Sequence, residues 1–401
     1  MTAPETEKPA ATCPVEMHEF KPCGREAYDD KGRCICHSEK PDKDAAAFQR
    51  EIKAMLDRKD YDFSWFVFPG HADFEGRVFD RRVWFRGAKF QRAPYFMGAT
   101  FQDVADFWAA TFQRGATFVR ATFRSEAWFL HATFQGLAGF GRATFRGDAK
   151  FSGAWFQGGA RFTGYEDDWV FSREADVDFR WAHFAQSGEV MFEHVFLGRA
   201  RFLKTDVREV DFTDVEWAPR GRHRAVWDEM EPKGPAKNYA LIGELYRQLK
   251  HNYEEKRDPI PAGDFHFGEM EMRRLEPCKG WLRATYRRYL SAIAFYRWVS
   301  GYGEDYILPL AWIAGVILGF ALAFAAIPAL ALQTSPSSGA SHAVAGLRPH
   351  LLYSVMCFLL RGDKPLQPAY LAGHYMSVAE GILGPPLIAM FVLALNRRFK
   401  R

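Results

Sequence analysis

Residues 99–134 read ATFQDVADFWAATFQRGATFVRATFRSEAWFLHATF, and this stretch decides the fold. Phe recurs here at alternating steps of five and six residues, and the alternation runs without a miss from Phe63 to Phe162, giving a strict 11-residue period. From Ala99 onward, an Ala lies two positions before each of these Phe residues. A helix with about 3.6 residues per turn would scatter the Phe side chains around its axis, and a simple strand needs a period of two.

The pattern is typical of a β-solenoid whose short faces each turn one Ala-x-Phe unit inward. The two inward residues lie two positions apart on an extended segment, as strand pleating requires, and the Gly and polar residues between units suit corners. Four faces predict a coil of about 22 residues, with Phe stacked over Phe at about 4.8 Å. The register loosens after Phe162, and irregular Phe positions extend the solenoid to about Trp217, or roughly seven coils.

The Ala-x-Phe units resemble the pentapeptide-repeat family in its Phe-centred form. The resemblance implies a right-handed, quadrilateral β-solenoid over residues 63–217 that offers a rigid surface to a protein partner. Some members of that family are uniformly acidic and mimic duplex DNA. Here residues 63–162 carry 13 Lys/Arg against 7 Asp/Glu, and residues 163–217 carry 6 against 13. The rod is therefore dipolar, and we expect no nucleic-acid partner.

The composition of the 401-residue chain excludes several classes of protein. With 25% charged and 48% hydrophobic residues and a mean hydropathy of −0.27, it is neither a disordered chain nor a polytopic transporter. Six Cys without an N-terminal apolar stretch argue against a secreted disulfide framework. We do not expect an enzyme, because no nucleophile, base and oxyanion set is recognisable. His266, Glu269 and Glu271 are interpreted as a solvated helix face.

Four Cys and two His lie within residues 13–37, a segment without a core of its own. Thiolates and imidazole suit Zn²⁺, and metal binding would supply folding energy that such a segment lacks. We predict a closed structural zinc site with the ligands Cys13, Cys23, Cys34 and His37. Cys36 competes as third thiolate, His18 is a lesser candidate, and free thiols or a redox pair are the alternatives. The set resembles the Cys…Cys…Cys-x2-His knuckle before the repeats of some pentapeptide-repeat proteins, including the trailing Asp42-Lys43-Asp44.

The remaining segments are assigned by composition and periodicity. We expect a disordered start and the knuckle over residues 1–44, and a short helix within 45–62. Residues 218–304 are expected to form a linker and helical connector, with Pro/Gly-rich composition at 218–237 and apolar spacing typical of a helix from Tyr239 to Tyr253. In Trp281–Trp298, Arg residues lie among aromatics, which suits the cytoplasmic interface of a bilayer.

Residues 305–401 have the pattern of an α-helical membrane domain. Ile307–Leu332 holds 26 residues without a charged side chain, and Tyr375–Leu395 holds 21 with the single charge of Glu380, so both can span a lipid bilayer. Arg and Lys cluster before the first span and after the second. The positive-inside rule therefore predicts a multi-pass protein of the plasma (inner) membrane with both termini and the solenoid cytoplasmic. Leu347–Leu360 is too short to cross and predicts a re-entrant or interfacial helix.

The order span, short helix, Gly-Asp, span is similar to the pore module of the potassium-channel superfamily. Gly362-Asp363 stands at the place of the last two residues of the Gly-Tyr-Gly-Asp filter, and the similarity implies a homo-oligomer, a tetramer if it is a channel. Leu360 and Arg361 stand at the places of the filter Gly and Tyr. We therefore expect no K⁺ selectivity, and a ring of Arg361 favours a non-selective or anion-preferring pore.

Glu380 is the one acid inside the second span, and an ionisable residue there predicts a function. Arg361 or His374 is the expected partner, and an interfacial position near the outer end of the span is the alternative. For the whole protein, the alternative to an ion channel with a cytoplasmic sensor or docking arm is a non-conducting, membrane-anchored scaffold.

Overall fold

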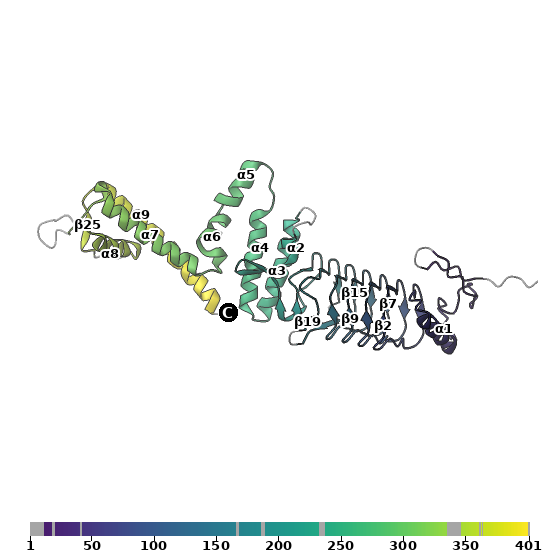
Figure 1. Cartoon of the computed structure of the whole chain (residues 1–401). Coiled ribbons are helices and arrows are strands. Elements are labelled where there is room, and N and C mark those ends of the chain that lie inside the picture. Colours follow the sequence, from purple (N-terminus) through teal and green to yellow (C-terminus); the bar gives the residue numbers. More distant parts are fainter. Residues whose placement is uncertain are drawn as a thin grey trace, which may run out of the picture. The chain divides into compact units, whose positions relative to one another are not determined.

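The structure is a computed structural model that describes residues 12–17, 21–40, 42–165, 168–185, 189–231, 237–334, 346–360, 362 and 364–399. The chain divides into two compact units, Met1–Asn252 and Tyr253–Arg401, and each is considered by itself. The first contains the solenoid with its two ends, and the second contains the helices that follow it (Figure 1).

Within the described residues, the solenoid strands form four parallel sheets of six, six, five and four strands. The first sheet contains β1 (Val67–Phe68), β4 (Lys89–Phe90), β7 (Thr111–Phe112), β11 (Thr133–Phe134), β15 (Trp155–Phe156) and β18 (His183–Phe184). The second contains β3 (Val83–Trp84), β6 (Ala105–Asp106), β10 (Ala127–Trp128), β14 (Ala149–Lys150), β17 (Val177–Asp178) and β20 (Ala200–Arg201). The third contains β8 (Ala116–Thr117), β12 (Ala138–Gly139), β16 (Ala160–Thr163), β19 (Val190–Phe196) and β21 (Asp211–Glu216), and the fourth β2 (Val78–Phe79), β5 (Thr100–Phe101), β9 (Thr122–Phe123) and β13 (Thr144–Phe145).

The strand register confirms the predicted repeat. Ala127 pairs with Ala105 on one side and with Ala149 on the other, so one coil takes 22 residues. The Phe side chains stack inside the solenoid, as the rings of Phe107 and Phe129 show with centroids 4.8 Å apart and planes inclined by 2°. Figure 1 shows the coils following one another along this part of the chain. A β-solenoid of about seven coils is therefore the fold of this region.

The regular register ends where the sequence predicts. Phe162 pairs with Phe192 and Phe192 with Phe212, and neither step equals the 22-residue coil. The two rings of each pair are nevertheless stacked, with centroids 4.9 Å and 5.6 Å apart. The Phe column therefore continues through longer and shorter coils, because corners can absorb extra residues while the inward positions stay in line.

Both ends of the solenoid are covered by other elements. At the first coil, α1 (Ala45–Asp57) begins at Asp44, whose carboxylate accepts hydrogen bonds from two backbone N–H groups, and it packs Phe48 against Phe68. At the last coils, the hairpin of β22 (Ala218–Arg220) and β23 (His223–Ala225) is followed by α2 (Trp227–Met230) and α3 (Tyr239–Glu255). The amide nitrogen of Asn252 in α3 lies within hydrogen-bond distance of three backbone carbonyls between Val207 and Val210. Covered ends protect exposed strand edges from pairing with other chains.

The second unit is helical. Its elements are α4 (Pro259–Leu275), α5 (Trp281–Thr285), the π-helical η2 (Tyr286–Leu290), α6 (Ala292–Ser300), η3 (Gly301–Gly303), α7 (Ile307–Ala326), η4 (Pro328–Leu330), β24 (Leu332–Thr334), α8 (Leu347–Phe358), β25 (Leu366–Pro368) and α9 (Leu371–Phe399). Helices α7 and α9 are long and apolar enough to cross a membrane, by length and composition. The short α8 packs against both of them, and β24 pairs with β25 in an antiparallel ladder.

The helix face of Glu269 and Glu271 differs from its prediction. Both side chains are buried, at 2% and 1% exposure, rather than solvated. Glu271 accepts hydrogen bonds from the Tyr302 hydroxyl at 2.7 Å and from Arg274 at 3.0 Å, and it forms an ion pair with Arg297 at 2.8 Å. Burial raises the pKa of Glu271, but these partners outweigh it and leave the pKa below its usual value. Arg297 and Tyr302, which follow later in the sequence, therefore explain how the carboxylate of Glu271 can be buried.

Candidate metal centre and membrane hairpin

Two short antiparallel contacts bring the first two Cys residues of the knuckle together. Thr12 bridges Glu26, and Glu16 bridges Pro22. The backbone N–H of Cys13 donates to the carbonyl of Arg25 at 2.7 Å, and that of Cys23 donates to Val15 at 2.9 Å. The ladder therefore sets Cys13 and Cys23 on neighbouring segments, which local sequence separation alone does not do.

The other two ligands come from one tight turn. The backbone N–H groups of His37 and Ser38 both donate to the carbonyl of Cys34, at 3.0 Å and 2.9 Å. This turn brings the Sγ of Cys34 to 3.2 Å from the Nδ1 of His37, while the Sγ of Cys13 lies 3.4 Å from the same nitrogen. The potential ligand atoms of Cys13, Cys23, Cys34 and His37 all lie within 4.8 Å of one another. This Cys3His cluster could hold a metal ion.

The structure distinguishes Cys34 from Cys36. Cys36 is buried but is not part of the cluster. Its backbone carbonyl accepts a hydrogen bond from the N–H of Val67 at 2.8 Å, so this residue joins the knuckle to the first strand of the solenoid. The geometry therefore favours Cys34 as the third thiolate. His18, the lesser candidate, lies outside the described residues.

The imidazole of His37 is oriented by the solenoid. Its Nε2 lies 3.1 Å from the backbone carbonyl of Ser64, and because a carbonyl can only accept, Nε2 carries the hydrogen. Nδ1 is then left free to bind a metal, which is the usual division between the two ring nitrogens of a metal-bound His. The ring of Phe66 meets the imidazole edge-on at 5.1 Å. The first coil thus fixes both the ring plane and the tautomer.

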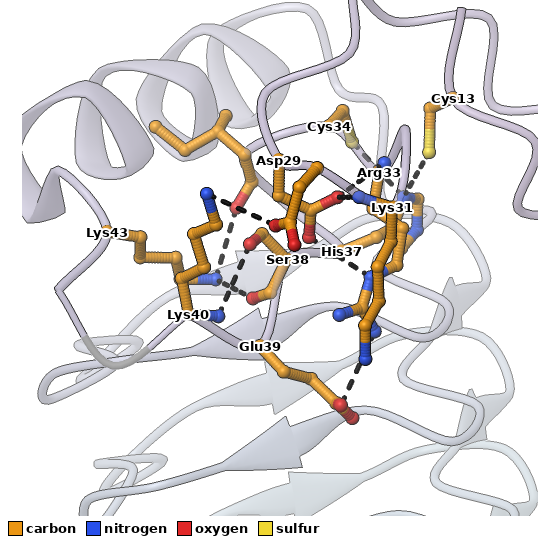
Figure 2. A network of polar contacts seen from close by, with 12 residues as sticks. Cys13, Asp29, Lys31, Arg33, Cys34, His37, Ser38, Glu39, Lys40 and Lys43 are labelled. Atoms are coloured by element: carbon orange, nitrogen blue, oxygen red, sulfur yellow. Dashed lines mark hydrogen bonds and ion pairs between the residues drawn. The ribbon is translucent and has the colours of Figure 1, made fainter.

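Polar side chains around the cluster hold its loops in place (Figure 2). Lys43 is 5% exposed, and its ammonium donates to the backbone carbonyls of Ile35, Ser38 and Val67. Burial lowers the pKa of Lys43 to about 8. The carboxylate of Asp29 accepts from the backbone N–H groups of Lys31 and Arg33 and from the Arg33 side chain. The loop that carries Cys34 is therefore braced from both sides.

One further cation lies beside the sulfur atoms. The guanidinium of Arg25 is 3.3 Å from the Sγ of Cys23 and forms an ion pair with Glu51 of α1 at 3.1 Å. A hydrogen bond with Cys34 and burial raise the pKa of the Cys23 thiol, and Arg25 opposes this shift. Arg25 was not identified from the sequence, because its role depends on a contact with α1. Lys43 had a signal in the Asp42-Lys43-Asp44 motif.

In the helical unit, Glu380 is fully buried in α9. Its described partner is the hydroxyl of Ser354 in α8, which also contacts the carbonyl of Ile317 in α7 at 2.8 Å. Its carboxyl is not exposed and lies among groups of three helices. His374 is not its hydrogen-bond partner, and Arg361 lies outside the described residues.

The residues at the predicted filter positions lie just after α8. Leu360 is 63% exposed and has a positive φ of 53°, and Gly362 is exposed as well. Arg361 and Asp363 lie outside the described residues. Lys364 turns back toward α8, with its ammonium 3.3 Å from the Sγ of Cys357. An open cavity of about 750 Å³ lies between α8, β25 and α9, and Leu360, Gly362 and Lys364 contribute to its lining.

Comparison with protein families matches residues 85–133 and 129–164 to the family described as pentapeptide repeats (9 copies). These coils are pentapeptide repeats. The match covers the most regular part of the solenoid, where the 22-residue register holds without interruption. Comparison with curated proteins and with solved structures gave no match.

The outer surface of the pentapeptide-repeat solenoid carries exposed aromatic and charged side chains. The rings of Trp65 and Trp108 are 44% and 39% exposed and meet edge-to-face at 6.4 Å. Further along, the guanidinium of Arg82 lies 4.7 Å from the ring centroid of Trp128, and the ammonium of Lys204 lies 3.7 Å from that of Trp181. Trp and Arg are the residue types that most often contribute to binding energy at protein interfaces.

Proposed function

We propose that the protein is an ion-channel-like membrane protein whose hairpin of α7, α8 and α9 assembles with further copies into a pore, a tetramer by analogy with the potassium-channel superfamily. The observation that carries this proposal is the packing of α8, too short to cross a bilayer, against both candidate spans. In this proposal α8 is re-entrant, the pore lacks K⁺ selectivity, and the right-handed, quadrilateral solenoid is its cytoplasmic sensor or docking arm.

The contact between α8 and α9 supports a built hairpin rather than two loosely associated spans. A Cβ atom added at Gly384 would lie 2.1 Å from the backbone carbonyl of Phe358, at the end of α8. Such an approach is possible only without a side chain, as in other close helix contacts within membranes. The end of α8 therefore has one defined place on α9, which is what a pore loop requires.

A specific observation favours the alternative of a non-conducting anchored scaffold. Selectivity filters are built from consecutive backbone carbonyls or from rings of charged side chains. Here Leu359 and Leu360 follow α8, and both are exposed apolar side chains. In the scaffold proposal the hairpin only holds the pentapeptide-repeat solenoid at the membrane, and its Trp- and Arg-bearing surface binds another protein.

Planar-bilayer recording of the purified full-length protein separates the two proposals. The variants are Arg361→Ala, at the filter position, and Arg348→Ala, an exposed Arg at the start of α8 that serves as matched control. A pore through Arg361 predicts discrete currents whose ion selectivity changes in Arg361→Ala and not in Arg348→Ala. Silence from inserted wild-type protein refutes the channel. A scaffold predicts that its cellular function is lost on deletion of residues 63–217 and kept in Arg361→Ala.

The same proposal places α5, η2 and α6 at the cytoplasmic surface of the bilayer, with both chain termini in the cytoplasm. Trp281, Leu290 and Phe295 are 76%, 72% and 60% exposed, and α6 leads into α7 through η3. Exposed aromatic and aliphatic side chains interleaved with Arg are typical of segments that lie in the headgroup region. Reporter fusions at residue 401 test the topology, since an active periplasmic reporter at that end contradicts it.

We also propose that the knuckle holds one structural Zn²⁺ and that the protein is not an enzyme. Two sulfur atoms bound to a tetrahedral zinc at about 2.3 Å lie about 3.8 Å apart, and the Sγ atoms of Cys23 and Cys34 are 3.7 Å apart. Four protein ligands leave no open position for a substrate. When bound, the ion would join the ladder of Cys13 and Cys23 to the turn of Cys34 and His37.

Metal analysis of the purified full-length protein tests this assignment. We expect about one zinc per chain, loss of the metal in Cys34→Ser, and retention in Cys36→Ser and in Cys278→Ser. Cys278 lies outside the cluster and controls for the loss of a thiol elsewhere. Zinc retained in Cys34→Ser and lost in Cys36→Ser would instead support the other thiolate.

A further inference from the structure

Glu380 has an unusual hydrogen-bond environment. The carboxyl is 0% exposed, Oε1 contacts the hydroxyl of Ser354, and Oε2 has no hydrogen-bond partner. The hydroxyl of Ser354 contacts a second group, the backbone carbonyl of Ile317, at 2.8 Å. The three groups belong to α9, α8 and α7, so a single chain of contacts joins the three helices of the hairpin.

The number of hydrogens in this chain determines the state of the carboxyl. A Ser hydroxyl has one hydrogen to donate, and a backbone carbonyl can only accept. The contact between Ser354 and Ile317 therefore uses the hydroxyl hydrogen. The contact between Ser354 and Glu380 then needs a hydrogen of its own, and an ionised carboxylate has none. Both contacts are satisfied together only when Glu380 is a carboxylic acid that donates to Ser354.

We infer that Glu380 is a proton-binding site inside the hairpin, a neutral acid whose hydrogen links α9 through Ser354 to the backbone of α7. An ionised carboxyl at this depth would be costly, because it is fully buried and its Oε2 has no hydrogen-bond partner among the described residues. Loss of the proton would leave the single hydrogen of Ser354 between two acceptors, the Ile317 carbonyl and the carboxylate, so one of the two contacts would lose its hydrogen bond. The position of α8 therefore depends on this proton, and the inference rests on the proposed function only in placing α9 within the bilayer.

The other ionisable groups near this site are engaged elsewhere. On α8, His350 contacts the carbonyl of Gly346 at 2.6 Å, and the Tyr353 hydroxyl contacts Ser377 at 2.8 Å. Cys357 is contacted by the ammonium of Lys364, which also lies 5.6 Å from the Tyr353 ring. Helix α7 carries no ionisable side chain. Lys364 attracts the charge of Glu380 electrostatically, but the described contacts include no ion pair between the two side chains.

Labelling with dicyclohexylcarbodiimide, an apolar reagent, tests the inference on full-length protein in liposomes at neutral pH. The O–H of a carboxylic acid adds across one C=N bond, the oxygen going to carbon and the proton to nitrogen, and an acyl shift to nitrogen then gives a stable acylurea with no atom lost. We expect a peptide of α9 to gain one whole reagent at Glu380. Glu380→Gln should abolish this label and leave the hairpin folded, because the Gln amide can donate to Ser354 as the acid does.

Infrared spectroscopy of the same samples gives an independent readout. A protonated carboxyl in an apolar site has a C=O band above the amide region, and we expect one such band that is absent in Glu380→Gln. No labelling at Glu380 together with no band would overturn the inference. These outcomes are separate from conduction, since a silent protein that shows the label and the band supports the proton site, and a conducting protein that shows neither refutes it.

Discussion

The Phe column makes a quantitative prediction for the variant Phe118→Ala. Phe118 is fully buried, and its ring stacks on Phe96 at 4.9 Å and on Phe140 at 5.0 Å. Truncation of a buried Phe to Ala costs about 3–5 kcal/mol. The backbone ladder fixes the distance between coils on both sides, so the cavity cannot collapse, and we expect about 4 kcal/mol, near the middle of this range. A domain is stabilised by only about 5–15 kcal/mol in total.

Hydrogen exchange followed by mass spectrometry on the full-length protein in detergent measures this loss. A cost of about 4 kcal/mol corresponds to about a 1,000-fold drop in amide protection. Because each coil contacts only its neighbours, we expect the drop to be largest in peptides that cover residues 96–140 and smaller toward both ends. Thr117→Ala, at the preceding residue in β8 and only partly buried, is the matched control and should change little. Equal protection in Phe118→Ala and Thr117→Ala would refute the reasoning that the Phe column stabilises the solenoid.

Three further predictions concern other parts of the chain. Gly384→Ala should separate α8 from α9 and increase proteolysis of the hairpin, because the added Cβ meets the carbonyl of Phe358, whereas Gly319→Ala in α7 meets no atom within 4 Å and should be neutral. Burial raises the pKa of Asp228 to about 6 from 3.8, so the folded state binds this proton more tightly than the unfolded state. The free energy of unfolding should therefore rise, by at most about 3 kcal/mol, as pH falls from 6 toward 3.8. Melting curves of Asp228→Asn over a pH series should lose this slope, and a variant that keeps it contradicts the assignment. Leu290→Glu removes an exposed apolar anchor, so it should increase hydrogen exchange of α5 and η2 in liposomes. The same substitution should not increase exchange in controls of this peptide segment in buffer without detergent.

The fold of the solenoid could be predicted from the sequence because the inward position on every face of the coil is filled by the same residue type. The alternation of steps is visible in Phe107, Phe112 and Phe118, and the structure buries all three. The potential ligands of the knuckle could also be predicted from the sequence, because Cys and His are the residue types that bind zinc and they lie within one short segment. The sequence favours Cys34 but leaves Cys36 as a competitor, because the hydrogen bond that ties Cys36 to Val67 of β1 is visible only in the structure.

The burial of Glu271 and Glu380 shows a second limit of sequence reasoning. Both are acids in helices, and helical periodicity alone does not say which partner will cover them. Glu271 is buried because Arg297 and Tyr302 approach from segments that follow it. Glu380 is buried because Ser354 of α8 reaches it across the hairpin. Partners brought together by tertiary packing have no fixed spacing in sequence, so these environments become visible only in the structure.

The constant 22-residue coil has a consequence for how the solenoid can change in evolution or by design. Each coil adds one strand spacing, about 4.8 Å, to the distance between the knuckle at one end and α3 at the other. The described contacts of α1 and α3 with the solenoid lie at its first and last coils, so a whole coil can be inserted or removed between them without altering these residues. The length of the solenoid therefore changes in steps of one coil, and it can be set independently of the elements attached at its two ends.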